Sequence, residues 1–96
     1  MDNIESLRKA IKKLHGCDSE YTESVPVKET FKGQTVWEGV VEVFNLIGHP
    51  KAKRCYAWSH AEGINDSETR YVVVLELPPV NSARTAVQAN IVSRYK

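Results

Sequence analysis

The chain has 96 residues, 42% of them hydrophobic, and its 13 basic and 12 acidic side chains leave a formal charge of +1. This length predicts one small domain over residues 1–96, and the balance of charge excludes a protein-wide electrostatic attraction to nucleic acid or anionic lipid. No apolar run reaches the roughly 18 residues of a membrane-spanning helix, and Met1–Glu5 lacks the basic and apolar regions of a signal peptide. We therefore expect a cytoplasmic protein without membrane contact, with Cys17 and Cys55 as reduced thiols.

The first predicted element is an amphipathic helix. Its apolar side chains recur at spacings of three, four and three residues, the period of one helical face: Ile4, Leu7, Ile11 and Leu14. Asp2 can cap the first turn with Glu5 as its capping-box partner, and Gly16 ends the run. Residues 17–20 are then expected to form a loop.

A first strand is predicted around Val25–Lys32, where apolar and polar side chains alternate. Pro26 has no backbone N–H to donate to a neighbouring strand, so this strand is expected at an edge of the sheet. Gly33 and Gln34 then predict a hairpin turn into a second strand over Val36–Phe44.

The second strand has apolar side chains on both faces, which suits the centre of a sheet. One face carries no charge: Trp37, Gly39, Val41 and Val43. The other face should meet water but is still more than half apolar: Val36, Glu38, Val40, Glu42 and Phe44. This second face is the main functional clue in the chain.

Two further strands are predicted over Arg54–His60 and Thr69–Leu77, after a break at Gly48–Pro50. The third strand separates large side chains from small ones, and the small ones leave room for a helix to approach: Cys55, Ala57 and Ser59.

Ser82 is a good helix cap, and a second helix is predicted after it. Four apolar residues would form its buried stripe: Ala83, Ala86, Val87 and Ile91. A short strand is the alternative, because apolar and polar residues also alternate over 87–91.

The fold class predicted is α+β: a helix, a four-stranded mainly antiparallel sheet and a helix, with short connections that favour hairpins. Both helices are expected to pack on one sheet face, formed by nine side chains: Val25, Val27, Trp37, Val41, Val43, Tyr71, Val73, Leu75 and Leu77.

The opposite sheet face would then expose six apolar side chains: Val40, Phe44, Tyr56, Trp58, Val72 and Val74. Charged residues would flank them at the strand ends, including Arg70 and Glu76. Monomers seldom expose contiguous apolar patches beyond a few hundred Å². The sequence therefore predicts an assembly or protein-interaction module that forms a homo-oligomer, with a twofold dimer favoured. A loop over 18–24 that covers this face is the alternative.

Two other functions remain open. A small-ligand-binding or catalytic domain could place its pocket on the same apolar face. Alternatively, the segment Lys51–Trp58 could bind nucleic acid, because aromatic rings interleaved with cations stack on bases and neutralise phosphates. The residues of this second hypothesis are Lys51, Lys53, Arg54 and His60, beside Tyr56 and Trp58. The small net charge speaks against it.

Four residues are potential metal ligands: His15, Cys17, Cys55 and His60. Their spacings match no common zinc motif, so neither a metal nor a cofactor is expected. Cys55 and His60 point to opposite faces of one strand and cannot form a nucleophile–base pair. His60 with Glu62 or Asp66 could form an acid–base group in a loop. The sequence leaves open whether the protein is an enzyme and identifies no catalytic residue.

The run Gly48–His60, with Val40–Phe44 before it, resembles a segment of small uncharacterised bacterial proteins, including those carried on mobile gene cassettes. That resemblance implies no activity. The predicted element order is also similar to that of the double-stranded-RNA-binding domain, which has three strands. That family's second helix has a basic start, whereas Asn81–Arg84 offers one cation.

Overall fold

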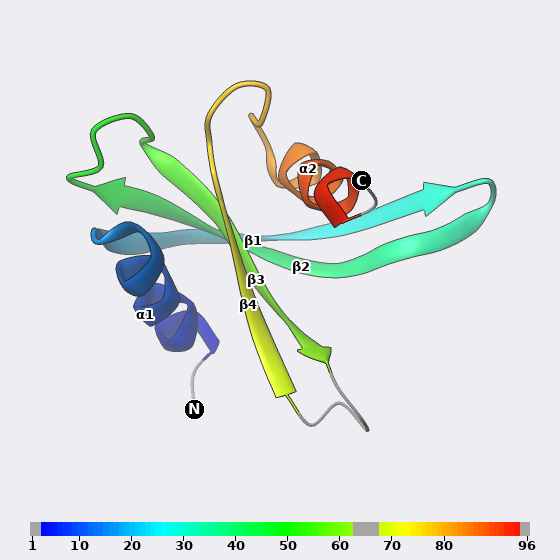
Figure 1. Cartoon of the computed structure of the whole chain (residues 1–96), viewed down its shortest axis with the longest axis horizontal. Helices are drawn as coiled ribbons and strands as arrows, with labels where there is room; N and C mark the ends of the chain where they lie inside the picture. The colour runs from blue at the N-terminus through cyan, green and yellow to red at the C-terminus, as the bar shows by residue number, and fades with distance from the viewer. Residues whose placement is uncertain (1–2, 63–67, 95–96) are drawn as a thin grey trace.

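The computed structural model describes residues 3–62 and 68–94 and contains two helices and one sheet (Figure 1). The elements are α1 (Asn3–His15), β1 (Asp18–Phe31), β2 (Gln34–Ile47), β3 (Arg54–Glu62), β4 (Glu68–Leu75) and α2 (Ala83–Arg94). The strands pair antiparallel in the order β1-β2-β3-β4. The predicted α+β class and the order helix, four-stranded sheet, helix are confirmed.

Helix α1 forms where the apolar period predicted it. Leu7 and Ile11 are fully buried, whereas Leu14 at the end of the stripe is 59% exposed. Gly16 ends the helix with a φ of 70°, a left-handed conformation that glycine adopts without strain. Its backbone N–H donates to the Lys12 carbonyl at 2.8 Å.

The sheet consists of two hairpins that are joined over a short stretch. β1 and β2 pair along almost their whole length, but β2 pairs with β3 only where Glu42–Asn45 faces Arg54–Ala57. Figure 1 shows the β1–β2 hairpin and the β3–β4 hairpin crossing near the centre of the molecule. Beyond this crossing, the two hairpins diverge.

Strand β1 begins at Asp18, within the segment that was expected to be a loop. Its register with β2 shifts between Tyr21 and Glu23 and leaves Thr22 as an extra residue. One extra residue reverses the faces of the side chains that follow it. Cys17 accordingly packs with the α1 cluster while Val27 packs with the α2 cluster, although both have odd numbers.

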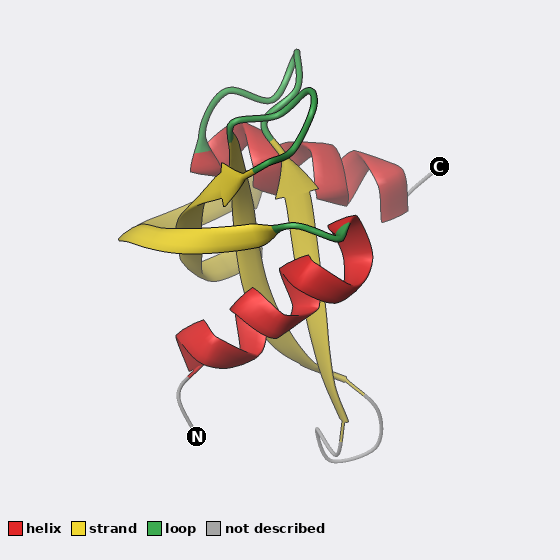
Figure 2. Cartoon of the chain, turned by 90° about the vertical axis from the view of Figure 1, so that its left-hand side faces the viewer, coloured by secondary structure: helices red, strands yellow, loops and turns green. Residues whose placement is uncertain are grey.

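The two helices cover opposite faces of the sheet, so the prediction that they share one face is wrong. The cluster that includes α2 has nine buried side chains, the last three of them from the helix itself: Val27, Val41, Val43, Tyr56, Trp58, Val80, Ala83, Ala86 and Val87. The α1 cluster has six: Leu7, Ile11, Cys17, Phe44, Cys55 and Ala57. Successive residues of β3 alternate between these clusters, as successive strand residues must when the sheet lies between them. Figure 2 shows the strands passing between the helices.

Side-chain size explains this arrangement. The small side chains of Cys55 and Ala57 let α1 approach one face closely, and the large rings of Tyr56 and Trp58 fill the space under α2 on the other. The second helix is confirmed over the alternative strand. Ser82 caps it by accepting a hydrogen bond from the backbone N–H of Thr85 at 3.2 Å.

Candidate functional site

The predicted interaction face is mostly inside the molecule. Tyr56 and Trp58 are 2% exposed under α2, and Phe44 is fully buried on the α1 side. The expectation of an exposed apolar sheet face is therefore wrong for these three residues. Val40 is 52% exposed on the β1–β2 hairpin, and Val72 and Val74 are partly buried on β4.

Register explains why these side chains separate. Val43 pairs with Tyr56 and Phe44 pairs with Cys55, so an even-numbered residue of β2 shares a face with an odd-numbered residue of β3. Phe44 and Tyr56 consequently point to opposite faces. The sequence shows the parity of each strand but not how the strands are aligned with each other.

The two rings suggested for stacking on bases are not available beside the basic residues. Lys51, Lys53 and Arg54 are exposed, and His60 is partly buried. The ring of Trp58, however, packs inside the protein, edge-to-face against Trp37, with 5.5 Å between ring centroids. Neither Trp58 nor the equally buried Tyr56 presents a face on which a base could stack.

The cysteines and histidines form no cluster typical of a metal site. Cys17 and Cys55 are free and buried, and burial with the neighbouring Cys17 raises the pKa of the Cys55 thiol to about 12. Within the described ranges, no group of three or more His, Cys, Asp or Glu side chains is placed to hold a metal ion. The acid–base hypothesis for His60 with Glu62 or Asp66 depends on side chains outside the described ones.

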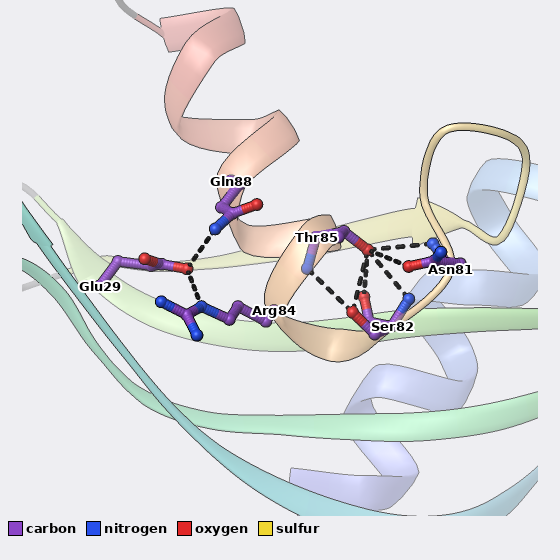
Figure 3. Close-up of polar contacts among 6 residues, drawn as sticks. All are labelled: Glu29, Asn81, Ser82, Arg84, Thr85 and Gln88. Carbon is purple, nitrogen blue, oxygen red and sulfur yellow. Dashed lines mark hydrogen bonds and ion pairs between the residues drawn. The ribbon is translucent and has the colours of Figure 1, made fainter.

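A cavity of about 470 Å³ lies between β1, the start of β3 and the first turn of α2. Val25 and Tyr56 line it, and Arg54 and Arg84 are among its charged residues. Arg84 is already occupied, because its Nε donates to the buried Glu29 at 3.0 Å (Figure 3). This cavity is the nearest counterpart of the predicted ligand pocket.

The two outer strands of the sheet differ in how well their edges are protected against pairing. β1 contains Pro26, the extra residue Thr22 and five charged side chains: Asp18, Glu20, Glu23, Lys28 and Glu29. Proline, bulges and charges all hinder the addition of another strand. β4 pairs with β3 without a register shift, and its two charged residues, Glu68 and Arg70, stand at its start. The residues after them, Tyr71–Leu75, include neither proline nor charge.

The backbone of β4 offers hydrogen-bonding groups on its outer side. The N–H of Glu76 donates to the Arg54 carbonyl at 2.9 Å, so Glu76 faces β3 across the ladder. In an antiparallel pair, residues alternate between facing the neighbour and facing away. The N–H groups of Tyr71, Val73 and Leu75 therefore point outward. Within residues 3–62 and 68–94, no strand pairs with this edge.

The outer edge of β4 also carries apolar side chains. Tyr71 is 41% exposed, and the four residues after it are partly buried. Val72 and Val74 pack on the α2 cluster, and Val73 and Leu75 pack on the α1 cluster. The edge thus presents an apolar strip on both faces of the sheet.

Charges stand at both ends of this strip. Arg70 precedes it and Glu76 follows it, and both have the parity of the side chains on the α2 face. The Glu76 Oε2 atom accepts a hydrogen bond from the Tyr56 hydroxyl. Burial and the hydrogen bond to Glu76 raise the pKa of Tyr56 to about 12, so its hydroxyl keeps its proton at neutral pH.

Sequence reasoning included Val72 and Val74 in the interaction site, assigned Tyr71 and Val73 to the face expected under the helices, and did not identify the β4 edge. A signal was available in the uninterrupted run Tyr71–Leu75, which lacks the features that protect β1. It could not be used, because the sequence does not show which strand lies at the edge.

Comparison of the chain with protein-family models, with curated proteins and with solved structures finds no match. The resemblance of Gly48–His60 to a segment of bacterial mobile-cassette proteins therefore stays a prediction. Neither described helix is long and apolar enough to cross a membrane.

Proposed function

We propose that this protein is an assembly module that associates by adding a strand to the outer edge of β4. The observation that supports it is the unprotected edge: over Tyr71–Leu75 the strand has outward N–H groups, no proline, no bulge and no charge. Such an edge is a template for pairing with another polypeptide.

Strand addition suits both the backbone and the side chains of β4. The outward N–H groups and the carbonyls of Tyr71 and Val73 would exchange water for hydrogen bonds to the partner, whereas the Leu75 carbonyl already accepts one from the Leu77 N–H at 2.9 Å. The partly buried Val72 and Val74 would lose their remaining contact with water. The homo-oligomer inferred from the sequence is retained in this proposal. Its interface moves from the sheet face, which α2 covers, to the sheet edge.

A twofold dimer is the simplest product of such an edge. Two copies of one strand can pair antiparallel about a twofold axis and so cover each other's edge in one closed contact. The result would be a continuous sheet of eight strands, four from each copy. Each copy would keep its helices on opposite faces.

Tyr71→Pro tests the proposal. Proline at this position removes an outward N–H without removing a hydrogen bond to β3, so the chain should fold but not pair. Sedimentation at micromolar concentrations should give twice the 10.8 kDa chain mass for the wild type and the single mass for the variant.

Tyr71→Val is the matched control. It keeps the backbone N–H and the preference for a strand, and we expect it to remain a dimer. Circular dichroism and thermal unfolding would confirm that all three proteins are folded. A wild-type protein that sediments as a monomer throughout this concentration range would rule out the proposal.

A further inference from the structure

The charges of β4 are arranged so that the strand complements a copy of itself. Val73 lies three residues after Arg70 and three residues before Glu76. When two such strands run antiparallel with Val73 at the centre, Arg70 of each copy stands opposite Glu76 of the other. Opposite charges directly across a strand pair are favourable, and two pairs form at once by symmetry.

The hydrogen-bonding pattern of the edge permits the same centre. Because the N–H and C=O of Val73 point outward, two copies of this residue placed opposite each other can exchange both hydrogen bonds. A centre at Val72 would satisfy the same outward groups, with Tyr71 opposite Val73 and a non-hydrogen-bonded pair at the axis. It would place Arg70 opposite an apolar Val74, so the charges, and not the hydrogen bonds, select the centre at Val73.

The side chains agree with this register on both faces. Val72 would lie beside Val74 of the second copy on the α2 face, and Tyr71 beside Leu75 of the second copy on the α1 face. A slip by one residue would move every side chain to the wrong face of the partner's sheet. Glu76 can keep its contact with Tyr56, because that hydroxyl bonds to Oε2 and leaves Oε1 for the partner.

From this geometry we infer that β4 selects a second copy of this chain, in the register centred on Val73. Arg70 and Glu76 are the residues that determine this specificity. The inference rests on the proposed function, since it names the partner of the edge described there. It adds that an unrelated strand lacking this charge order would pair less well.

Charge exchange tests the inference. In a dimer of Arg70→Glu, four acidic side chains meet at the two ends of the strip, and in a dimer of Glu76→Arg, four basic ones do. Each variant alone should dimerise at least about tenfold more weakly than the wild type. An equimolar mixture should form a heterodimer with wild-type affinity, because each end again pairs an acid with a base.

A cross-link tests the register without changing any charge. In the inferred dimer the two Val73 Cα atoms would be about 5.5 Å apart, within disulfide range. Val73→Cys should therefore give a covalent dimer under mild oxidation by copper phenanthroline. Val72→Cys should not, because its two copies would be displaced along the strands. The wild type, with its buried cysteines, is the baseline.

The outcomes separate this inference from the proposed function. Suppose that Tyr71→Pro disrupts the dimer, but both charge variants still dimerise and Val73→Cys forms no cross-link. The inferred register would then be wrong, while the proposed assembly at β4 would stand. If Tyr71→Pro left the dimer intact, both the inferred register and the proposed assembly at β4 would be wrong. Heterodimer formation together with the Val73→Cys cross-link would support the inference even if one charge variant were less stable.

Discussion

At the scale of single residues, Gly39 is needed because an aromatic ring lies over it. A Cβ atom built at Gly39 would be 3.1 Å from the Trp37 ring, closer than ordinary van der Waals contact. Trp37, which is partly buried, in turn packs edge-to-face on the buried Trp58. Gly39 thus leaves room for the Trp37 ring to lie along its own strand.

Gly39→Ala should lower the free energy of unfolding by about 1 kcal/mol, because the added methyl displaces the Trp37 ring. In a Trp37→Val background, the same substitution should raise it by roughly 0.5 kcal/mol, since alanine costs less backbone entropy than glycine. Urea unfolding of the four proteins measures both effects. Equal changes in the two backgrounds would show that the ring is not the cause.

A second residue-scale feature makes stability depend on pH. Burial and the neighbouring His49 lower the pKa of His15 below its ordinary value of 6.5, and the two rings lie 6.2 Å apart. The folded chain therefore binds fewer protons here than the unfolded chain does. The contribution of His15 to the free energy of unfolding should be fully present above pH 6.5 and should fall as the pH drops below that value.

His15→Gln removes this titration. The wild type should lose urea resistance between pH 7.5 and pH 5.5, and the variant should lose less over the same interval. His60→Gln is the control, because it removes a histidine that lies on β3. If all three proteins had the same pH dependence, the His15–His49 pair would not be responsible.

At the scale of elements, one acidic side chain connects helix α2 to strand β1. Glu29 is 7% exposed and its Oε1 accepts hydrogen bonds from Arg84 Nε at 3.0 Å and from Gln88 Nε2 at 2.9 Å (Figure 3). Arg84 and Gln88 are one turn apart on α2. This contact therefore sets the rotation of the helix as well as its position.

Glu29→Gln should destabilise the protein by about 1 kcal/mol, a modest value because the Arg84 side chain is 69% exposed and water screens its charge. Glu23→Gln, an exposed change on the same strand, should have little effect. Urea denaturation compares them. A loss no larger for Glu29→Gln than for its control would show that the contact contributes little.

The element scale also shows where sequence patterns failed. The beginning of β1 was missed because the extra residue Thr22 interrupts its alternation, and no pattern of period two survives an inserted residue. Helix α1 had no such interruption, and its apolar period located it correctly. Gly16 marked its end because glycine at that position is a local, conformational requirement.

At the scale of the whole molecule, the sheet is apolar on both faces because each face receives a helix. The alternation of small and large residues on β3 follows from that sandwich. On β2, Phe44 and Leu46 reach the α1 cluster, whereas Val36 and Val40 stay exposed. Among the described strands, β4 is an outer one, and its residues Tyr71–Leu75 carry neither proline nor charge. The proposed dimer would cover this edge, and the Tyr71→Pro and charge-exchange experiments test that assembly.

The sequence by itself determined the helices, most of the strands, the α+β class and the apolar character of both sheet faces. These properties depend on the order of residues within one segment, through periods and caps. Only the tertiary structure decided that Phe44 and Tyr56 lie on opposite faces, that Trp58 is covered by α2 and that β4 is an edge. Those facts depend on the register and order of strands, which long-range packing selects and no single segment encodes.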